Sequence, residues 1–575
     1  MRTTRITSFR PRSCSARVVL LLAAAAAAAA LGSCAKPPIP TEPRQPREIA
    51  APDYLKDTVG EVARLSGREP VPVQGYGFVT GLDGTGTKVV PPGVRQQILD
   101  IMRRRKVEKP EEILTNPDNA VVTVVGYLTP GIAKGERFDL EVRTVPNTET
   151  TSLEGGFLLE GDLTRVVSAR GVETRGESLA LGRGSVFVSP FGGKDGKATG
   201  DPRVGRILGG GKAIKTRHFK LVLLSPSVRT ADQIVRLVNA RFPGAAKSTQ
   251  DPGQIDLAVP RDFESDKPHF LDLVGALYMR ETSDVRDQRI AMLIDALRTG
   301  KDLDTVSTCL ESFGSAVVPR LYPLADEPGE SVRFYVGRTL ARLQDARAVS
   351  VLERIVKDNA SEFQESAVVA LGQLRTGLGL GLLNRALNAP SARVRVAAWL
   401  ASERLAPGTF GAQTFPDKFT LSLVPTTAEP FVYIARTLRP RIAIFGDVKV
   451  RPPVLAETHR VTANAVADAQ KVQLTSRRRG ETLRAESTLD LKAVIARIAR
   501  PIVTKGATEA QLDAVDTANL PGLDLGYSDV VGLVNEFSRK NALTGSLMLE
   551  PLQYQIGGDR PTARPISDAP PSPQS

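Results

Sequence analysis

The stretch QGYGFVTGLDGTGT, residues 74–87, constrains the fold of this chain more than any other part of it. Tyr76, Phe78 and Leu82 give it the apolar content of a strand, but glycines interrupt it. Glycine is retained where the backbone needs φ > 0 or approaches another backbone closely. Asp83-Gly84 is a tight-turn signal. We therefore predict a strand that ends in a turn and packs closely against its neighbours. The glycines are Gly75, Gly77, Gly81, Gly84 and Gly86.

A phosphate-binding loop is the obvious enzymatic interpretation of these glycines, and the spacing argues against it. Gly81 and Gly86 stand where that pattern needs its two glycines, but Lys88 comes one position late. Val89 follows it, so no hydroxyl remains for Mg²⁺. Pro91-Pro92-Gly93 further disfavours a helix directly after the loop. We expect no nucleotide site here.

The segments that follow predict a β-rich region. Ala120–Tyr127 and Arg137–Val145 have the patterns of a buried strand and an alternating strand. A turn is expected to begin at Val204, and Thr230 is expected to cap a helix that ends near Phe242.

The glycine stretch resembles the signature of bacterial flagellar P-ring proteins, which form a ring around the flagellar rod in the periplasm, at the peptidoglycan layer. Further segments resemble that family in the same order, so the resemblance covers about residues 59–284. They are PGIAKGERFDLEV, TSLEGGFLL, VGRI, VNARF and GQIDLAVPRDF. The resemblance implies a homo-oligomeric ring, with rod and L-ring proteins and peptidoglycan as further partners. Closed rings need heterologous interfaces whose rotation closes.

The N-terminus predicts export and a lipid anchor. Arginines precede an apolar run, residues 18–31, which is too short for a comfortable membrane span. The run ends in Leu31-Gly32-Ser33-Cys34, which resembles a bacterial lipobox and implies lipidation of Cys34. Residues 1–33 are then the signal peptide and residues 34–58 a Pro-rich tether. The alternative is an ordinary signal peptide with a chance cysteine.

The location that follows is the periplasm, with a lipid tether to the outer membrane because Ala35, not Asp, comes after the cysteine. The net charge of +13 favours anionic partners, but export argues against nucleic acid.

Cysteine and histidine usage excludes the common chemical sites. Cys14 is removed with the signal and Cys34 is lipidated, so Cys309 is the only free thiol and no internal disulfide can form. The histidines, His218, His269 and His459, are far apart and show no metal-ligand spacing.

No catalytic motif stands out in the sequence. Asp83 and Glu154 are best interpreted as carboxylates of their own turns. We expect a protein that is not an enzyme and has no metal or cofactor.

Residues 285–408 predict amphipathic helices that repeat about every 31 residues. Leu340 and Leu343 recur as Leu371 and Leu374, and Leu352 recurs as Leu383. This pattern resembles short HEAT-type helix pairs. The segment is a spacer or an arm that docks an unknown protein.

Residues 409–556 return to strand patterns. The segment EPFVYIARTLRPRIAIFGDVKVRPPVL resembles a P-ring hairpin that normally follows an element like HFLDLVGALYMRE, residues 269–281. The helical array therefore resembles an insertion. A helix over Ser528–Lys540 and a final strand are expected, and residues 557–575 form a disordered tail.

The sequence as a whole predicts an α+β fold, with a β-rich body in two segments, 59–284 and 409–556, and an all-α HEAT-like solenoid between them. The implied function is that of a lipid-anchored structural subunit of a periplasmic ring. The alternatives are a non-flagellar lipoprotein adaptor that binds a partner through its repeats, and an enzyme acting on the cell wall. Ring contacts, or a purely structural motif, are assigned to the glycine stretch. Its residues are Gly75, Tyr76, Gly77, Gly81, Asp83, Gly84 and Gly86.

Overall fold

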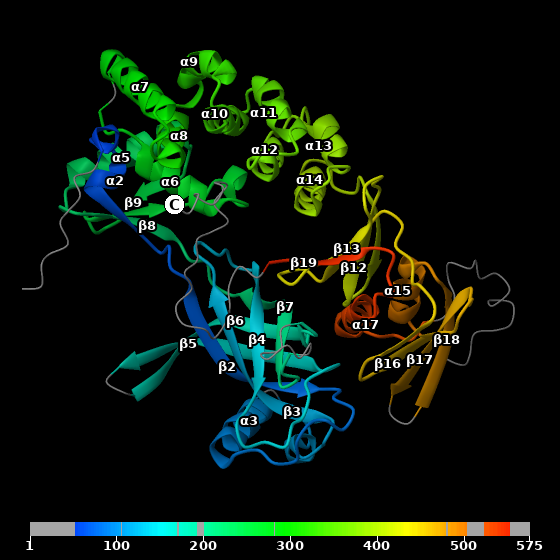
Figure 1. Ribbon diagram of the computed structural model, residues 1–575. Coiled ribbons are helices and arrows are strands. Elements are labelled where there is room, and N and C mark those ends of the chain that lie inside the picture. Colours follow the sequence, from blue (N-terminus) through cyan, green and yellow to red (C-terminus); the bar gives the residue numbers. More distant parts are fainter. Residues whose placement is uncertain are drawn as a thin grey trace, which may run out of the picture. The chain divides into compact units, whose positions relative to one another are not determined.

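The computed structural model describes residues 52–104, 106–169, 172–191, 200–280, 282–478, 481–502 and 522–551. The predicted signal peptide, Cys34 and the predicted tail lie outside these ranges. The described chain is α+β: it contains a closed barrel, three further sheets and a long run of helices. The colours of Figure 1 follow the sequence, and they show the long run of helices between an N-terminal set of strands and a C-terminal set of strands.

A small antiparallel sheet begins the described chain. Its elements are β1 (Ala63–Ser66), β8 (Phe219–Leu223), β9 (Ala246–Ser248), β10 (Gln254–Leu257), α2 (Val59–Val62), α5 (Val228–Arg241) and α6 (Lys267–Ala276). The strand order is β1-β8-β10-β9. Alternation along β8 turns Leu221 inward, where it shares one core with Ile234 of α5 and Phe270 of α6.

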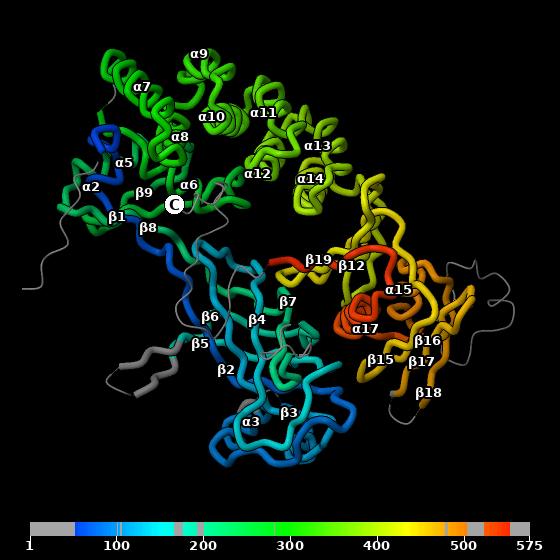
Figure 2. The backbone as a smooth tube through the Cα atoms, viewed as in Figure 1, coloured from blue at the N-terminus to red at the C-terminus, as the bar shows by residue number. Residues whose placement is uncertain are grey.

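A six-stranded closed barrel follows, and the first half of the glycine stretch, residues 74–80, lies in its first strand. The strands are β2 (Val71–Thr80), β3 (Asn119–Leu128), β4 (Arg137–Thr144), β5 (Phe157–Ala169), β6 (Val172–Ser185) and β7 (Val204–Ala213). They close in the order β2-β3-β4-β7-β6-β5. Figure 2 shows the blue segment that carries β1 of the first sheet on into β2. Val73 and Val79 of β2 belong to the interior core of the barrel.

The outer face of β2 is covered by helices. Phe78 lies in a second core with Ile98 and Met102 of α3 (Pro92–Arg104) and Leu114 of α4 (Pro110–Leu114). Adjacent residues of one strand thus enter different cores, as the period of a strand requires.

The helical segment runs from Ser283 to Leu405. Its helices are α7 (Ser283–Arg298), α8 (Leu303–Ser312), α9 (Val318–Leu321), α10 (Glu330–Arg342), α11 (Arg347–Lys357), α12 (Gln364–Leu371), α13 (Leu380–Ala386) and α14 (Ala392–Leu405). Hydrogen bonds link positions 31 residues apart: Arg342 Nε donates to Gln373 Oε1 (3.2 Å), and the Arg375 amide donates to Gln344 Oε1 (2.8 Å). This spacing equals the one seen in the sequence; the HEAT-like classification stays a prediction.

The C-terminal segment contains two sheets and two described helices. Its elements are β11 (Gly411–Phe415), β12 (Phe419–Val424), β13 (Phe431–Ile434), β14 (Arg441–Phe445), β15 (Val454–Glu457), β16 (Val461–Ala465), β17 (Lys471–Arg478), β18 (Glu481–Thr488), β19 (Ser546–Leu549), α15 (Leu491–Ala499) and α17 (Tyr527–Arg539). The strand orders are β11-β12-β14-β13-β19 and β15-β16-β17-β18.

The five-stranded sheet is covered on both faces. Ile442 and Ile444 of β14 lie in a core with α15 and α17, whereas Ala443 and Phe445 lie in the core of the helical segment. Strands buried on both faces are apolar throughout, which explains the continuous apolar run of β14.

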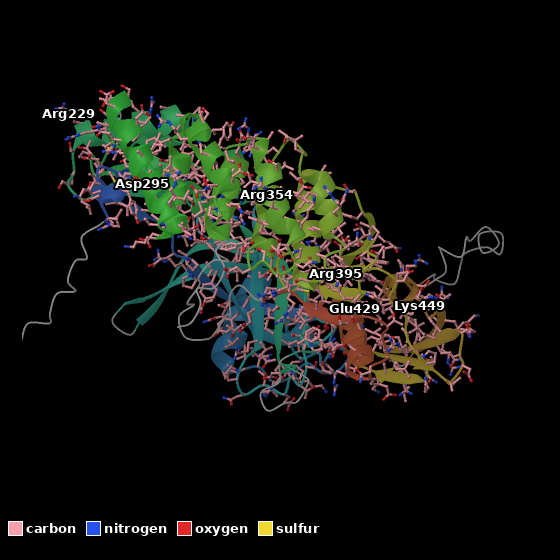
Figure 3. All side chains as sticks on the ribbon, turned by 45° about the horizontal axis from the view of Figure 1, so that its top comes forward. Arg229, Asp295, Arg354, Arg395, Glu429 and Lys449 are labelled. Carbon is pink, nitrogen blue, oxygen red and sulfur yellow. The ribbon has the colours of Figure 1, made fainter. Side chains whose placement is uncertain are left out.

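The helical segment therefore shares its core with the C-terminal sheet. Trp399 of α14 is fully buried and packs against Tyr433 and Phe445. Figure 3 shows Arg395 of α14 next to Glu429, and the Arg395 guanidinium donates to the Glu429 carbonyl oxygen at 2.5 Å. Helix α14, the last helix of the array, therefore packs directly on one face of the C-terminal sheet.

Several local predictions are confirmed, and three are wrong. The expected strands at 120–127 and 137–145 and the helix at 528–540 correspond to β3, β4 and α17. Residues 204–207 form strand β7 and not a turn, because pairing with β4 closes the barrel. The residues Pro91-Pro92-Gly93 were expected to disfavour a helix directly after the loop, but helix α3 begins at Pro92. Proline is tolerated in the first helical turn. Ser227, not Thr230, caps α5, and its hydroxyl accepts from the Thr230 amide.

Among the described residues, no helix combines the length and the apolar character that crossing a membrane requires.

Candidate functional site

The glycines within β2 face the interior of the barrel. A Cβ atom at Gly77 would lie 2.5 Å from Leu158 Cδ1 and 2.8 Å from Val124 Cγ2, and one at Gly75 would overlap the Asp162 carbonyl oxygen. A barrel of about eight strands has an interior just wide enough for side chains, and a six-stranded one is narrower. Two of the interior positions of β2 are glycine, Gly75 and Gly77, because the space that a side chain would need there is already filled.

The turn after β2 needs glycine for a different reason. Gly81 has φ +81° and Gly84 has φ +84°, in the left-handed region, and Asp83 between them has φ +47°. Two hydrogen bonds hold the turn against Asp118, the residue before β3. The Leu82 amide donates to the Asp118 carbonyl oxygen and the Gly84 amide donates to Asp118 Oδ1, each at 2.9 Å.

The last glycine of the stretch closes this turn. The Gly86 amide donates to the Pro117 carbonyl oxygen at 2.8 Å, and a Cβ atom at Gly86 would overlap the Asn119 carbonyl oxygen. Tyr76 is partly buried on the outer face of the barrel, against the core of α3. Contacts within the chain thus account for every glycine of the stretch, whether or not a second chain contacts it.

Beside this turn lies a group of charged side chains that comes from distant parts of the sequence. Arg460, in the turn between β15 and β16, lies 3.7 Å from Asp83 Oδ2 through Nη2 and 3.6 Å from Asp529 Oδ2 through Nη1. The Arg460 side chain is 9% exposed and that of Asp529 only 1%. A Cβ atom at Gly155, whose φ is +73°, would overlap the Arg460 guanidinium.

Two carboxyl groups complete the surroundings of Arg460. Asp529 lies in the first turn of α17 and accepts from the Gly526 amide at 3.0 Å, which caps the helix. Burial, and then the charge of Asp529, raises the pKa of Glu154 to about 7, although Arg460 acts in the opposite direction. The glycine turn and the C-terminal segment therefore meet through the buried guanidinium of Arg460.

A second polar contact joins the barrel to the C-terminal sheet. Asp139 Oδ1 of β4 accepts from the Gly209 amide at 2.7 Å and from the Leu438 amide at 2.8 Å. Arg206 Nη2 lies 3.5 Å from Asp139 Oδ2. Burial raises the pKa of the Asp139 carboxyl, against the lowering effect of these donors.

Apolar packing supports the same joint. The rings of Phe187 and Tyr527 have centroids 5.3 Å apart, and Phe187 and Leu208 lie in the core of the C-terminal segment. Ser528 Oγ donates to the Val188 carbonyl oxygen at 3.3 Å. The two sequence segments that were predicted to form one body are thus in direct contact.

Sequence reasoning identified Asp83 and Glu154 as turn residues and missed their partners. Arg460 and Asp529 are far from the glycine stretch in the sequence, and no periodic pattern contains them. Asp529 lay within the helix predicted at Ser528–Lys540, but its sequence position did not mark it as a partner of Arg460. No sequence signal marks Arg460 as the residue that joins the two segments. Cys34, the predicted lipidation site, lies outside the described residues.

What this site can do follows from its parts. Its members are carboxyl groups, one guanidinium and backbone turns, held by packing and ion pairs. Such an arrangement fixes one segment of the chain against another.

Comparison with known proteins finds a family whose model matches part of this chain. Residues 58–295 match the model of the flagellar P-ring protein family. A flagellar P-ring protein of Caulobacter vibrioides is 31% identical over 217 residues, which are 36% of this chain and 56% of the relative. One of Syntrophotalea carbinolica is 24% identical over 350 residues, 59% of this chain and 87% of the relative. One of Thermotoga maritima is 29% identical over 233 residues, 38% of this chain and 65% of the relative. The chain thus spans a little over half the length of the Caulobacter relative.

Proposed function

We propose that this chain is a structural subunit of a ring in the flagellar basal body, because residues 58–295 match the model of the flagellar P-ring protein family. The observation that carries the proposal is the place of the family region in the fold. It contains the whole barrel, with the first half of the glycine stretch in its first strand.

A ring subunit needs a rigid body, since errors in subunit geometry add up around a closed ring. The barrel and the C-terminal segment supply such a body, because they are joined by the Asp139 hydrogen bonds, the Arg460 ion pairs and a common apolar core. These contacts support a structural role and assign no reaction to the site.

The ring contacts themselves are proposed to lie around the glycine turn and the neighbouring strands of the barrel. Val89, shortly after the turn, is a large apolar residue with half of its surface exposed (51%). Single exposed apolar residues are common, so this contact needs a direct test.

The proposal includes the location and the remaining partners. We propose that the chain acts in the periplasm, encircles the flagellar rod beside the L-ring and the peptidoglycan, and is tethered to the outer membrane through lipid on Cys34. The warrant for the tether is the lipobox-like Leu31–Cys34 after an apolar run.

Imaging of basal bodies tests the ring directly. Basal bodies are purified from the parent strain, from a strain lacking this gene, and from that strain complemented with a tagged copy. The proposal expects a periplasmic ring that is absent only from the deletion strain and that carries the tag. Intact rings in the deletion strain would refute it.

A second candidate function is favoured by one observation. The family match ends at residue 295, before most of the helical segment Ser283–Leu405. A non-flagellar lipoprotein adaptor would use that segment to bind a protein partner. This reading expects motile cells with normal basal bodies after deletion of the gene, together with an envelope defect.

A further inference from the structure

The small sheet of β1, β8, β10 and β9 has one face in a core and the other face exposed. Phe219, Leu221 and Leu223 of β8 turn toward α5 and α6. The alternate residues point to the opposite side, as the period of a strand requires. These outward residues are all partly or fully exposed, and we call the surface that they form the open face. They are Arg64, Ser66, Lys220, Val222, Leu224, Lys247, Gln254 and Asp256.

Exposed apolar side chains gather at one end of the open face. Three of the eleven large apolar residues that are exposed in the described chain fall within residues 222–228. Val222 and Leu224 lie on the open face, 38% and 55% exposed, and Val228 in the first turn of α5 is 64% exposed. Scattered exposed apolar residues need no explanation, but a group of them marks a contact site. Arg229, also exposed, follows in the same turn, where a cation opposes the helix dipole.

The open face is also basic. Lys220, Asp256 and Lys247 are register partners in one row across three strands, and Arg64 is the partner of Val222 in the next row. All four strands are described, and Asp256 is the only carboxylate at their outward positions, where three cations stand. Lys220 Nζ lies 3.8 Å from Asp256 Oδ1. The charges of Arg64 and Lys247 are therefore in excess on this face.

We propose that the open face is a membrane-docking surface that lies on anionic phospholipid. Side chains stand roughly perpendicular to a sheet, so the outward residues form a level surface. Its cations would lie among the lipid phosphates, since basic residues near an anionic bilayer are attracted to it. Its exposed apolar side chains would enter the boundary between headgroups and acyl chains, as those of other interfacial surfaces do.

The place of this sheet in the chain favours a membrane over a soluble acidic protein. Strand β1 begins at Ala63, close to the start of the described chain at residue 52. Residues 34–51 would span about 60 Å when fully extended, so lipid on Cys34 would keep the open face within reach of the bilayer. Such tethering raises the effective concentration of a weak second contact. This step rests on the proposed anchor, whereas the exposure and the charge of the face do not.

Flotation with lipid vesicles tests the surface. The protein is the full mature chain with Cys34→Ser, which carries no lipid, and the vesicles contain phosphatidylcholine alone or mixed with phosphatidylglycerol. We expect binding only to vesicles with phosphatidylglycerol, and weaker binding at higher salt because exposed charges are screened. Since this protein has no anchor and needs no ring, a failure here is distinguishable from a failure of lipidation or of ring assembly.

Matched variants locate the contact. Arg64→Gln and Lys247→Gln should each weaken binding about fivefold, the contribution of one cation near an anionic bilayer. Lys449→Gln removes an exposed cation from the C-terminal segment and should bind as wild type does. Leu224→Ser should weaken binding at constant salt, whereas Leu455→Ser, at a similarly exposed position of β15, should not.

Absence of wild-type binding to phosphatidylglycerol vesicles at low salt overturns the proposal. Equal losses in Lys247→Gln and Lys449→Gln also overturn it, because binding would then follow the overall charge. So does unchanged binding of Leu224→Ser, which would remove the apolar contact. Retention on soluble polyglutamate without vesicle binding would assign the face to an acidic protein instead. Thermal unfolding checks each variant, and if Arg64→Gln does not fold, Lys247→Gln decides against Lys247→Arg, which keeps the charge and must keep the binding.

Discussion

Trp399 of helix α14 packs edge-on against Phe445 of strand β14, with ring centroids 5.8 Å apart and an interplanar angle of 85°. The guanidinium of Arg441 lies over the same indole, 4.4 Å from its centroid. One side chain thus joins the helical segment to the C-terminal sheet. The array and the sheet are expected to unfold together, because neither completes its core alone.

Replacement of Trp399 by alanine tests this coupling. Truncation of a fully buried tryptophan costs about 3–5 kcal/mol of unfolding free energy. We expect one cooperative transition at lower urea, reported both by helical circular dichroism and by exchange in β13 and β14. Leu378→Ala, at an exposed position, is the control and should change little. Loss of the helices with an unchanged sheet would show that the two units are independent.

The glycines of β2 should affect the folding stability of the unassembled protein. Gly77→Ala places a methyl group against Leu158 and Val124 inside the barrel and should cost about 1–3 kcal/mol through overpacking. Gly93→Ala is the matched control, because its Cβ would meet nothing within 4 Å. Thermal unfolding of the unassembled protein measures both. If the Gly77→Ala protein melts at the wild-type temperature but fails to assemble, the glycine motif acts as a ring contact and not as packing inside the barrel.

How much of this could be predicted differs between local and distant features. Glycine breaks and alternation located β2, β3 and β4, because these signals lie within a few residues of each other. The closure of the barrel was not predicted, since it depends on β7 pairing with both β4 and β6.

The candidate site was also predicted only in its local features and not in the contacts between distant segments. Asp83 was recognisable as a turn residue from Asp83-Gly84, yet its position next to Arg460 is set by packing between two distant segments. Arg460 lies in a hairpin turn. The residues around it show no hydrophobic periodicity, so the sequence does not indicate that its side chain is buried. Trp399 is the single tryptophan of the chain, and nothing in the sequence indicates which sheet it packs against.

Asp139 should contribute to the joint between the barrel and the C-terminal sheet. Asp139→Ala leaves the Gly209 and Leu438 amides without their acceptor and should cost about 1–3 kcal/mol. Asp447→Ala, at an exposed position, is the control. Because burial raises the pKa of the Asp139 carboxyl, its titration lowers stability as the pH rises, and the alanine variant should lose that part of the pH dependence. Equal stabilities of the two variants in urea would contradict this account.

The proposed anchor has a simple biochemical test. Cys34→Ser removes the only sulfur at the lipobox-like site, so the mature protein should no longer partition into detergent or incorporate labelled fatty acid. Cys14→Ser, within the predicted signal peptide, should leave lipidation intact. A Cys34→Ser protein that still carries the label would rule out this cysteine as the anchor.

Ring assembly is the last and most exposed of these predictions. Val89 is half exposed next to the glycine turn, so Val89→Glu should change the unfolding free energy by no more than about 0.5 kcal/mol. Buried in a contact between copies, the same charge would be left without a partner and would prevent assembly. Val466→Glu introduces the same charge at an exposed position of the β16–β17 connection and should assemble normally. The readout is the ring in basal bodies of complemented deletion strains, with thermal unfolding as the check on folding. Normal rings with Val89→Glu would move the contact away from this turn, and a missing ring with both variants would show only that added charge is not tolerated.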